Sequence, residues 1–119
     1  MKTYELFSGQ ELVIAEKIQQ RRLQILVHSC IYYELNTNII SDKQWDKYAR
    51  ELVQLQTAYP SIAEQVVWAD AFRNFDASTG FNLPIKDAWV MQKAMQFAGT
   101  QAKPKVKQQK PKIKKARLF

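Results

Sequence analysis

The chain has 119 residues, a length that fits one domain, and a formal net charge of +7. A single cysteine, Cys30, excludes an intramolecular disulfide, and no apolar run approaches the roughly 20 residues that a membrane span needs. No secretion signal is visible, so secretion and membrane insertion are not expected.

The first part of the chain has the pattern of a long helix. Ser8 and Glu11 have the spacing of a capping box, and apolar residues recur from Leu12 to Ile31 without Gly or Pro. We therefore predict a helix over residues 9–35. Its polar segment EKIQQRR, residues 16–22, is expected on the solvated face.

A second helix is predicted after the polar turn of residues 36–38. Ser41 and Gln44 repeat the capping-box spacing, and Ile40 is placed to act as a hydrophobic staple. Pro60 ends this helix. Its apolar face is Trp45, Tyr48, Ala49, Leu52, Leu55 and Tyr59. The first two helices are therefore expected to form a long hairpin.

Two shorter helices are predicted beyond Pro60, which makes the fold class all-α. The first begins at Ser61 and is expected to bury Ile62, Val66, Val67, Ala69 and Phe72. The second begins at Pro84 and stops at Gly99. Its predicted apolar face is Ile85, Ala88, Trp89, Met91, Ala94, Met95 and Phe97 or Ala98. The loop between them, residues 72–84, holds three Phe, so we expect it to be packed down.

The end of the chain differs in composition from the rest. After Gln101 there is no acid, and the cations are Lys103, Lys105, Lys107, Lys110, Lys112, Lys114, Lys115 and Arg117. Pro104 and Pro111 disfavour helices there. We predict a domain over residues 1–99 and a flexible, disordered basic tail over residues 100–119.

The predicted tail suits contact with nucleic-acid phosphates, and a solubilising role is the alternative. It has no aromatic residue before Phe119, so base stacking is not its mode. Leu118 and Phe119 could serve as a peptide anchor in a partner's pocket.

Few residues are available for catalysis or metal binding. The chain has one His and one Cys and no Gly-rich phosphate loop, zinc-binding cluster or HExxH motif. His28 and Cys30 would point in different directions on a helix, so a buried Cys30 is expected. Asp42 and Asp46 are four residues apart and share a helix face, where the helix dipole favours their ionised forms. They are expected to accept hydrogen bonds or to be helix-start acids on a wet surface.

The stretch YYELNTNIISDKQWDKYARELVQLQTAYP, residues 32–60, resembles the small N-terminal helical domain of bacterial NAD-dependent DNA ligases. In that family a pair of aromatic or His residues ends one helix, and an S-D-x-x-Y-D pattern and an E-L-x-x-L-E-x-x-x-P run follow. The resemblance covers roughly residues 10–60. It implies that this domain grips the nicotinamide mononucleotide half of NAD.

The resemblance implies a role for each of five residues. Tyr32 and Tyr33 would line the nicotinamide and ribose, and Trp45, where the family usually has Tyr, would stack or pack on the ring. Asp42 and Asp46 would accept hydrogen bonds from ribose hydroxyls or the carboxamide. Aromatic faces and carboxylates both suit a cationic ring. The alternative is a hairpin kept as a scaffold, with the aromatic residues in its core.

The chain departs from the ligases in having no K-x-D-G motif, so no ligase activity is expected and the protein is predicted not to be an enzyme. Residues 69–84 look like sequences in small phage and prophage proteins. We therefore predict a non-catalytic phage or prophage protein in the cytoplasm of a host bacterium. It would act on a nucleic acid or a nucleic-acid enzyme, for example by inhibiting a host or defence nuclease. The alternatives are an accessory module that binds NAD or nicotinamide mononucleotide weakly and a protein-only inhibitor of a host factor.

Overall fold

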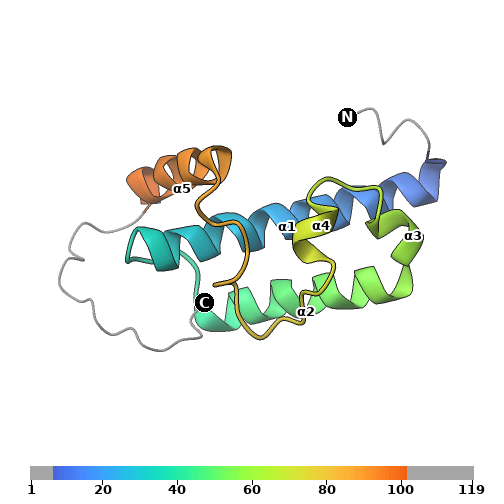
Figure 1. Ribbon diagram of the computed structural model, residues 1–119, viewed down its shortest axis with the longest axis horizontal. Helices are drawn as coiled ribbons and strands as arrows, with labels where there is room; N and C mark the ends of the chain where they lie inside the picture. The colour runs from blue at the N-terminus through green and yellow to red at the C-terminus, as the bar shows by residue number, and fades with distance from the viewer. Residues whose placement is uncertain (1–6, 102–119) are drawn as a thin grey trace.

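The computed structural model describes residues 7–101, and the side chains of residues 7–99, as five helices without strands (Figure 1). They are α1 (Gly9–Glu34), α2 (Asp42–Ala58), α3 (Pro60–Ala63), α4 (Ala69–Phe72) and α5 (Ala88–Gln101). The all-α prediction is confirmed.

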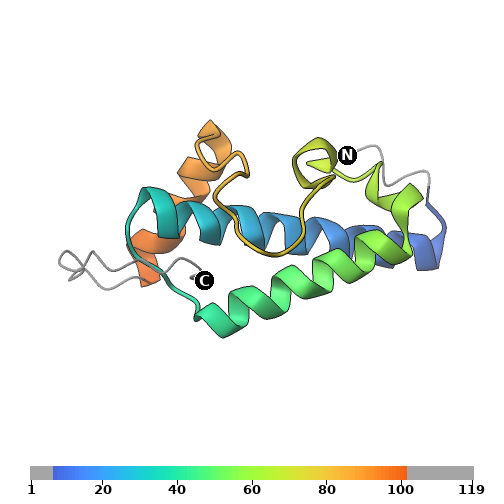
Figure 2. The same ribbon diagram turned by 60° about the horizontal axis from the view of Figure 1, so that its bottom comes forward.

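The predicted hairpin is present, since α1 and α2 run antiparallel beside each other (Figures 1 and 2). The N–H of Ser8 donates to the carboxylate of Glu11 at 3.3 Å, at the start of α1. The Ser41 hydroxyl accepts a hydrogen bond from the N–H of Gln44 at 3.0 Å, at the start of α2. Both predicted caps therefore fix where the helices begin.

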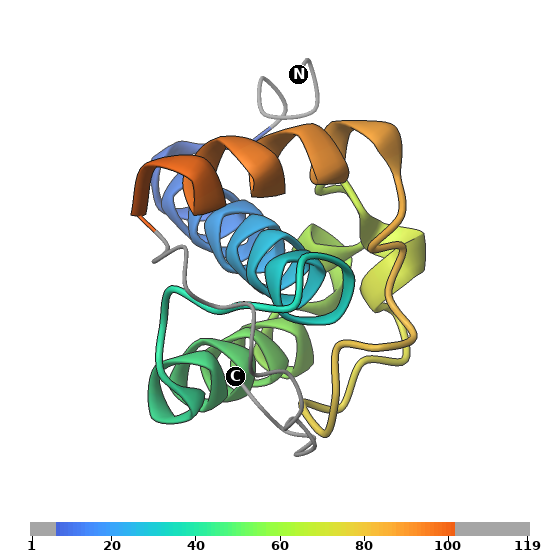
Figure 3. The ribbon, with the colours of Figure 1, turned by 90° about the vertical axis from the view of Figure 1, so that its left-hand side faces the viewer.

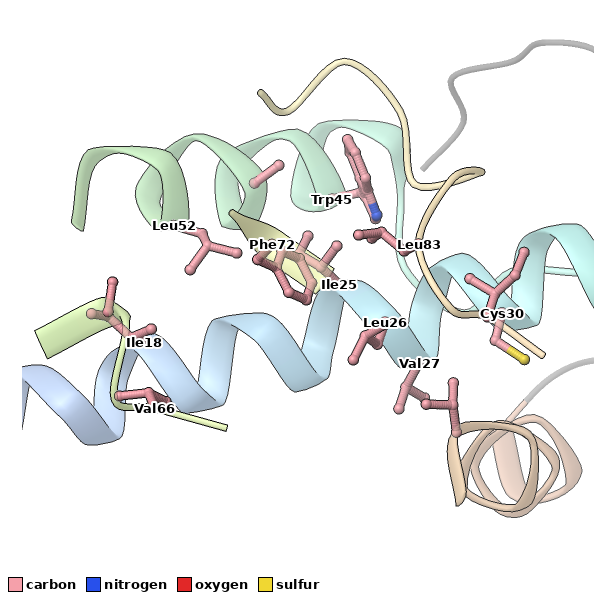
Figure 4. Packing of buried hydrophobic residues seen from close by; sticks show 14 of the residues in the cluster. Ile18, Ile25, Leu26, Val27, Cys30, Trp45, Leu52, Val66, Phe72 and Leu83 are labelled. Carbon is pink, nitrogen blue, oxygen red and sulfur yellow. The ribbon is translucent and has the colours of Figure 1, made fainter. Parts of the chain in front are cut away.

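Helix α1 lies in the middle of the molecule, with α2 on one side and α5 crossing it on the other (Figure 3). Its apolar residues therefore face two neighbours, and Ile25, Leu26 and Ile31 are fully buried. Figure 4 shows Trp45, Leu52, Phe72 and Leu83 converging on α1 from other parts of the chain. The core is one continuous cluster around α1.

Arg22 corrects the prediction that residues 16–22 form a solvated face, because this side chain is only 1% exposed. Its guanidinium donates to the backbone carbonyls of Ala63, Val66 and Val67 at 2.9–3.0 Å, and to the side-chain oxygen of Gln56 at 2.9 Å. The guanidinium thus provides donors to carbonyls at the end of α3 and just after it, which an aliphatic side chain could not do.

The single short helix predicted from Ser61 is broken into α3 and α4. Trp68 lies between them with φ 73°, a left-handed conformation that ends the regular helical path. The break turns Val67 outward, so its predicted burial is wrong, whereas Ile62, Val66 and Phe72 are buried as predicted and Ala69 is half-buried.

The last helix begins later and faces differently than predicted. Residues before Ala88 form turns, and the Asp87 carboxylate caps α5 by accepting from the N–H groups of Trp89 and Val90 at 2.8 and 3.2 Å. The buried residues of α5 include Val90 and Ala94, whereas Ala88, Trp89, Met95 and Phe97 are exposed. The helix also runs past Gly99, so the predicted stop there is wrong.

The predicted tail cations, Lys103 to Arg117, and the predicted anchor, Leu118 and Phe119, lie outside the described residues. The prediction of a disordered basic tail therefore stays a prediction. None of the helices in the described part of the chain is both long and apolar enough to cross a membrane.

Candidate functional site

The turn between α1 and α2 positions the predicted site residues. Asn36 adopts φ 57°, which Asn tolerates better than most residues, and turns the chain at the end of α1. The N–H groups of Leu35 and Thr37 both donate to the carbonyl of Ile31 at 3.2 and 3.3 Å. The last turn of α1 and the first turn of α2 therefore flank one junction.

Tyr32 and Tyr33 occupy the last turn of α1, and both are half-buried. Their rings meet edge to face with centroids 4.9 Å apart. The Tyr33 hydroxyl is 3.1 Å from the hydroxyl of Thr79, and its ring meets that of Phe81 at 5.2 Å. Tyr33 is thus engaged by a loop that is distant in sequence.

Trp45 points from α2 into the core and is only 4% exposed (Figure 4). Its indole N–H donates to the hydroxyl of Ser29 on α1 at 3.2 Å. Its ring meets Phe75 at a centroid distance of 6.3 Å. In this conformation the indole is therefore part of the packing between α1, α2 and the loop after α4.

The two acids lie in the first turns of α2. Asp42 is exposed at the start of the helix, and Asp46 is half-buried one turn later. The Asp46 carboxylate pairs with Arg50 at 3.2 Å across one turn of the helix. Both carboxylates stand near the positive end of the α2 helix dipole.

Residues 75–83, which we call the strap, pass over the junction and contact two of the five residues. Thr79 and Phe81 contact Tyr33, and Phe75 contacts Trp45. At Gly80 an added Cβ would lie 2.1 Å from the Ser29 hydroxyl and 3.5 Å from the Trp45 ring. The strap backbone therefore fits against the core only because this position has no side chain.

The expectation that the loop is packed down is correct for two of its three Phe. Phe72 is buried and Phe75 is half-buried, whereas Phe81 is 60% exposed. The Phe81 ring contacts Tyr33, and most of the side chain is exposed to solvent.

His28 and Cys30 show no arrangement for catalysis. Cys30 is buried as predicted, its thiol donates to the sulfur of Met91 at 3.3 Å, and burial and then Glu34 raise its pKa to about 11. Burial lowers the pKa of His28 to about 4. The Nδ1 of His28 is buried with no hydrogen-bond partner among the described residues. These groups are expected to be neutral near pH 7.

An open hollow of about 610 Å³ is lined by Trp68, Ala69, Asp70, Ala71, Asn82 and Pro84, none of which is among the five predicted residues. No group of three or more His, Cys, Asp or Glu in this part of the chain could hold a metal ion. The junction remains the candidate site.

Comparison with known proteins connects this junction to a family. Residues 11–65 match the model of a family described as DNA ligase-like, N-terminal NAD+-binding domain. The predicted resemblance is confirmed for this segment. All five predicted residues lie in the ligase-like segment, residues 11–65, and the strap lies outside it.

Individual relatives are similar over the same segment. A DNA ligase of Bacteroides fragilis is 41% identical over 54 residues, which is 45% of this chain and 8% of the ligase. DNA ligases of Thermotoga petrophila and Nitratidesulfovibrio vulgaris are 35% and 39% identical over 41% and 44% of this chain, and over 7% of each ligase. The chain thus matches less than a tenth of these relatives' length. No solved structure matches.

Sequence reasoning missed the residues that cover the junction. The sequence signals for the strap were the Phe residues and Gly80 in the loop. The signal for Ser29 was its position as a hydroxyl residue within the apolar run ILVHSCI. A buried hydroxyl in such a run needs a partner, and the indole of Trp45 is that partner.

Proposed function

We propose that the chain is a binding module for a nicotinamide nucleotide, with its site at the junction of α1 and α2. The observation that carries the proposal is the match of residues 11–65 to the NAD+-binding domain of DNA ligases, which includes all five junction residues. The matched segment holds no K-x-D-G motif, so the proposed role is binding and not nucleotide transfer.

The side chains at the junction fit the chemistry of nicotinamide mononucleotide. The carboxylates of Asp42 and Asp46 can accept hydrogen bonds from ribose hydroxyls and attract the cationic ring. The rings of Tyr32 and Tyr33 offer aromatic faces and edges to the nicotinamide. Asp46 would exchange its exposed pair with Arg50 for the ligand at small cost, because such surface pairs contribute little.

The test is a titration of the full chain with nicotinamide mononucleotide, followed by amide NMR shifts. We expect saturable shifts near the junction, and at least about tenfold weaker binding in the Asp42→Ala/Asp46→Ala double variant. Glu16→Ala is the matched control, because Glu16 is an exposed acid near the other end of α1. Equal affinity of the double variant and the control would contradict the roles given to the two acids.

A second candidate function is contact with nucleic-acid phosphates through the eight cations after Gln101. If all eight contacted a single strand, the logarithm of the binding constant would fall with the logarithm of salt concentration with a slope of about −5 to −6. Replacing the eight residues by Gln in the full chain should abolish this dependence. Unchanged nucleic-acid binding in that variant would exclude the tail as the contact.

The further predictions about biological role rest on the sequence alone. A phage or prophage origin, inhibition of a host or defence nuclease, and anchoring through Leu118 and Phe119 stay predictions. They would each be compatible with a nicotinamide site at the junction.

A further inference from the structure

We propose that the strap, residues 75–83, is a built-in competitor of the nucleotide at the junction, so that ligand binding requires the strap to move away. This inference rests on the proposed function. It concerns residues outside the ligase-like segment, and it assigns a regulatory role to a part of the chain that the family match does not include.

The first argument is that the strap occupies the aromatic surface of the junction. Phe75 contacts the ring of Trp45, and Phe81 contacts the ring of Tyr33, both edge to face. Both rings belong to residues to which the family resemblance gives a role in binding. A nicotinamide ring packed against either one would make the same kind of aromatic contact, so the strap and the ligand would compete for these surfaces.

The second argument is that the strap also satisfies the polar groups of the junction. The hydroxyls of Thr79 and Tyr33 are 3.1 Å apart, and the Thr79 hydroxyl accepts the N–H of Phe81 at 3.1 Å. The Tyr33 hydroxyl is therefore already hydrogen-bonded when the strap is closed. A ligand must replace this partner as well as the two ring contacts.

The third argument is that the strap contains no helix or strand and is shaped by its own turns. The Asp76 carboxylate accepts the N–H and hydroxyl of Ser78 at 3.0 and 2.6 Å, which lowers the pKa of Asp76. The N–H of Leu83 donates to the carbonyl of Gly80 at 3.2 Å. Such a turn-rich segment can open locally without unfolding of the helices, and opening exposes its amides, including that of Leu83, to exchange.

Gly80 is the position that permits closure. A methyl group there would lie 2.1 Å from the Ser29 hydroxyl and 2.8 Å from the Ser29 Cβ, closer than such atoms can approach. Gly80 has no positive φ, so alanine is compatible with its backbone. Gly80→Ala should therefore open the strap by steric conflict and leave the hairpin, where the acids lie, in place.

The linkage to binding is quantitative. If only a fraction of molecules has the strap open, the apparent dissociation constant is the intrinsic one divided by that fraction. We expect Gly80→Ala to lower the Kd for nicotinamide mononucleotide about tenfold, which corresponds to about 1.4 kcal/mol. Gly99→Ala is the matched control, because a Cβ at Gly99 meets no atom within 4 Å.

The experiment combines hydrogen exchange and titration on the full chain. The N–H of Leu83 and the indole N–H of Trp45 report strap opening without any ligand. We expect faster exchange at both in Gly80→Ala, together with tighter binding, and faster exchange at Leu83 when ligand binds the wild type. In a Ser29→Gly background, Gly80→Ala should not speed exchange at Leu83 further, because both clashing atoms are absent.

Two results would overturn the strap proposal while the proposed function stands. One is faster exchange in Gly80→Ala with unchanged or weaker binding, and the other is a Leu83 amide that stays protected when the wild type is saturated. If Gly80→Ala does not fold or does not loosen the strap, Thr79→Val/Phe81→Ser removes the strap's contacts to Tyr33 instead. A Kd for nicotinamide mononucleotide in that variant that is no lower than in the wild type also overturns the strap proposal. Absence of binding in a loosened variant would instead refute the proposed function.

Discussion

The indole N–H of Trp45 donates to the Ser29 hydroxyl at 3.2 Å, and this bond joins α2 to α1 inside the core, directly beneath Gly80. Three segments meet at this point: the end of α1, the start of α2 and the strap. The stability of the junction and the accessibility of the proposed site therefore depend on the same few atoms.

Removing the acceptor of this hydrogen bond should destabilise the fold. Ser29→Ala leaves the buried indole N–H without its acceptor, which costs about 1–3 kcal/mol in the free energy of unfolding. Denaturant unfolding followed by fluorescence measures the change. Ser61→Ala, at an exposed serine, is the control and should change stability by less than about 0.5 kcal/mol. Equal stability of the two variants would show that the indole finds another acceptor.

The buried guanidinium of Arg22 should be among the most sensitive positions. Arg22→Met keeps much of the volume but leaves the carbonyls of Ala63, Val66 and Val67 without this donor, so we expect a loss of about 3 kcal/mol or more. Arg50→Met, at an exposed arginine, should cost less than about 1 kcal/mol. A mild effect at Arg22 would mean that water replaces the guanidinium at these carbonyls.

The protein should lose stability in mild acid because of His28. Burial lowers the pKa of His28 in the folded protein to about 4, from an ordinary value of 6.5, so the unfolded chain binds an extra proton between these pH values. Stability is therefore unaffected by this group above about pH 6.5 and falls as the pH drops toward 4, by up to about 3 kcal/mol. His28→Gln should flatten this part of the profile. A wild-type profile that is already flat between pH 6.5 and 4.5 would contradict the burial of a neutral imidazole.

Two apolar residues of α5 separate the observed buried face from the predicted one. Val90 is fully buried, so Val90→Ala should cost about 2 kcal/mol through lost burial and a cavity. Met95 is 59% exposed, so Met95→Ala should cost less than about 0.5 kcal/mol. The two midpoints of denaturant unfolding provide the comparison. A larger loss of stability in Met95→Ala than in Val90→Ala would instead support the buried face predicted from the sequence.

The hairpin was predictable because local signals determine it. Capping serines, helical spacing of apolar residues and Pro60 place both helices to within about a residue. The candidate site follows from the resemblance, since Tyr32, Tyr33, Asp42, Trp45 and Asp46 fall in the segment that matches the family model, and their roles in binding stay predictions.

The burial of Arg22, the buried face of α5 and the position of the strap depend on tertiary contacts, which the periodicity of the sequence does not predict. Arg22 is buried because carbonyls of residues 63–67 come to it, and these lie more than forty positions away. The face of α5 is set by how this helix crosses α1, so Val90 and not Trp89 faces inward. The strap contacts on Tyr33 and Trp45 are equally non-local, so a turn-rich composition predicted a loop but not its position.

The most direct test of the account is a titration of the full chain and its Gly80→Ala variant with nicotinamide mononucleotide, read by amide NMR. The account predicts saturable shifts at Tyr32, Asp42 and Asp46 in both proteins, and tighter binding in the variant. Absence of shifts at millimolar ligand in both proteins, with the strap loosened in the variant, would contradict it. The hairpin would then be a ligase-derived scaffold without a nucleotide site.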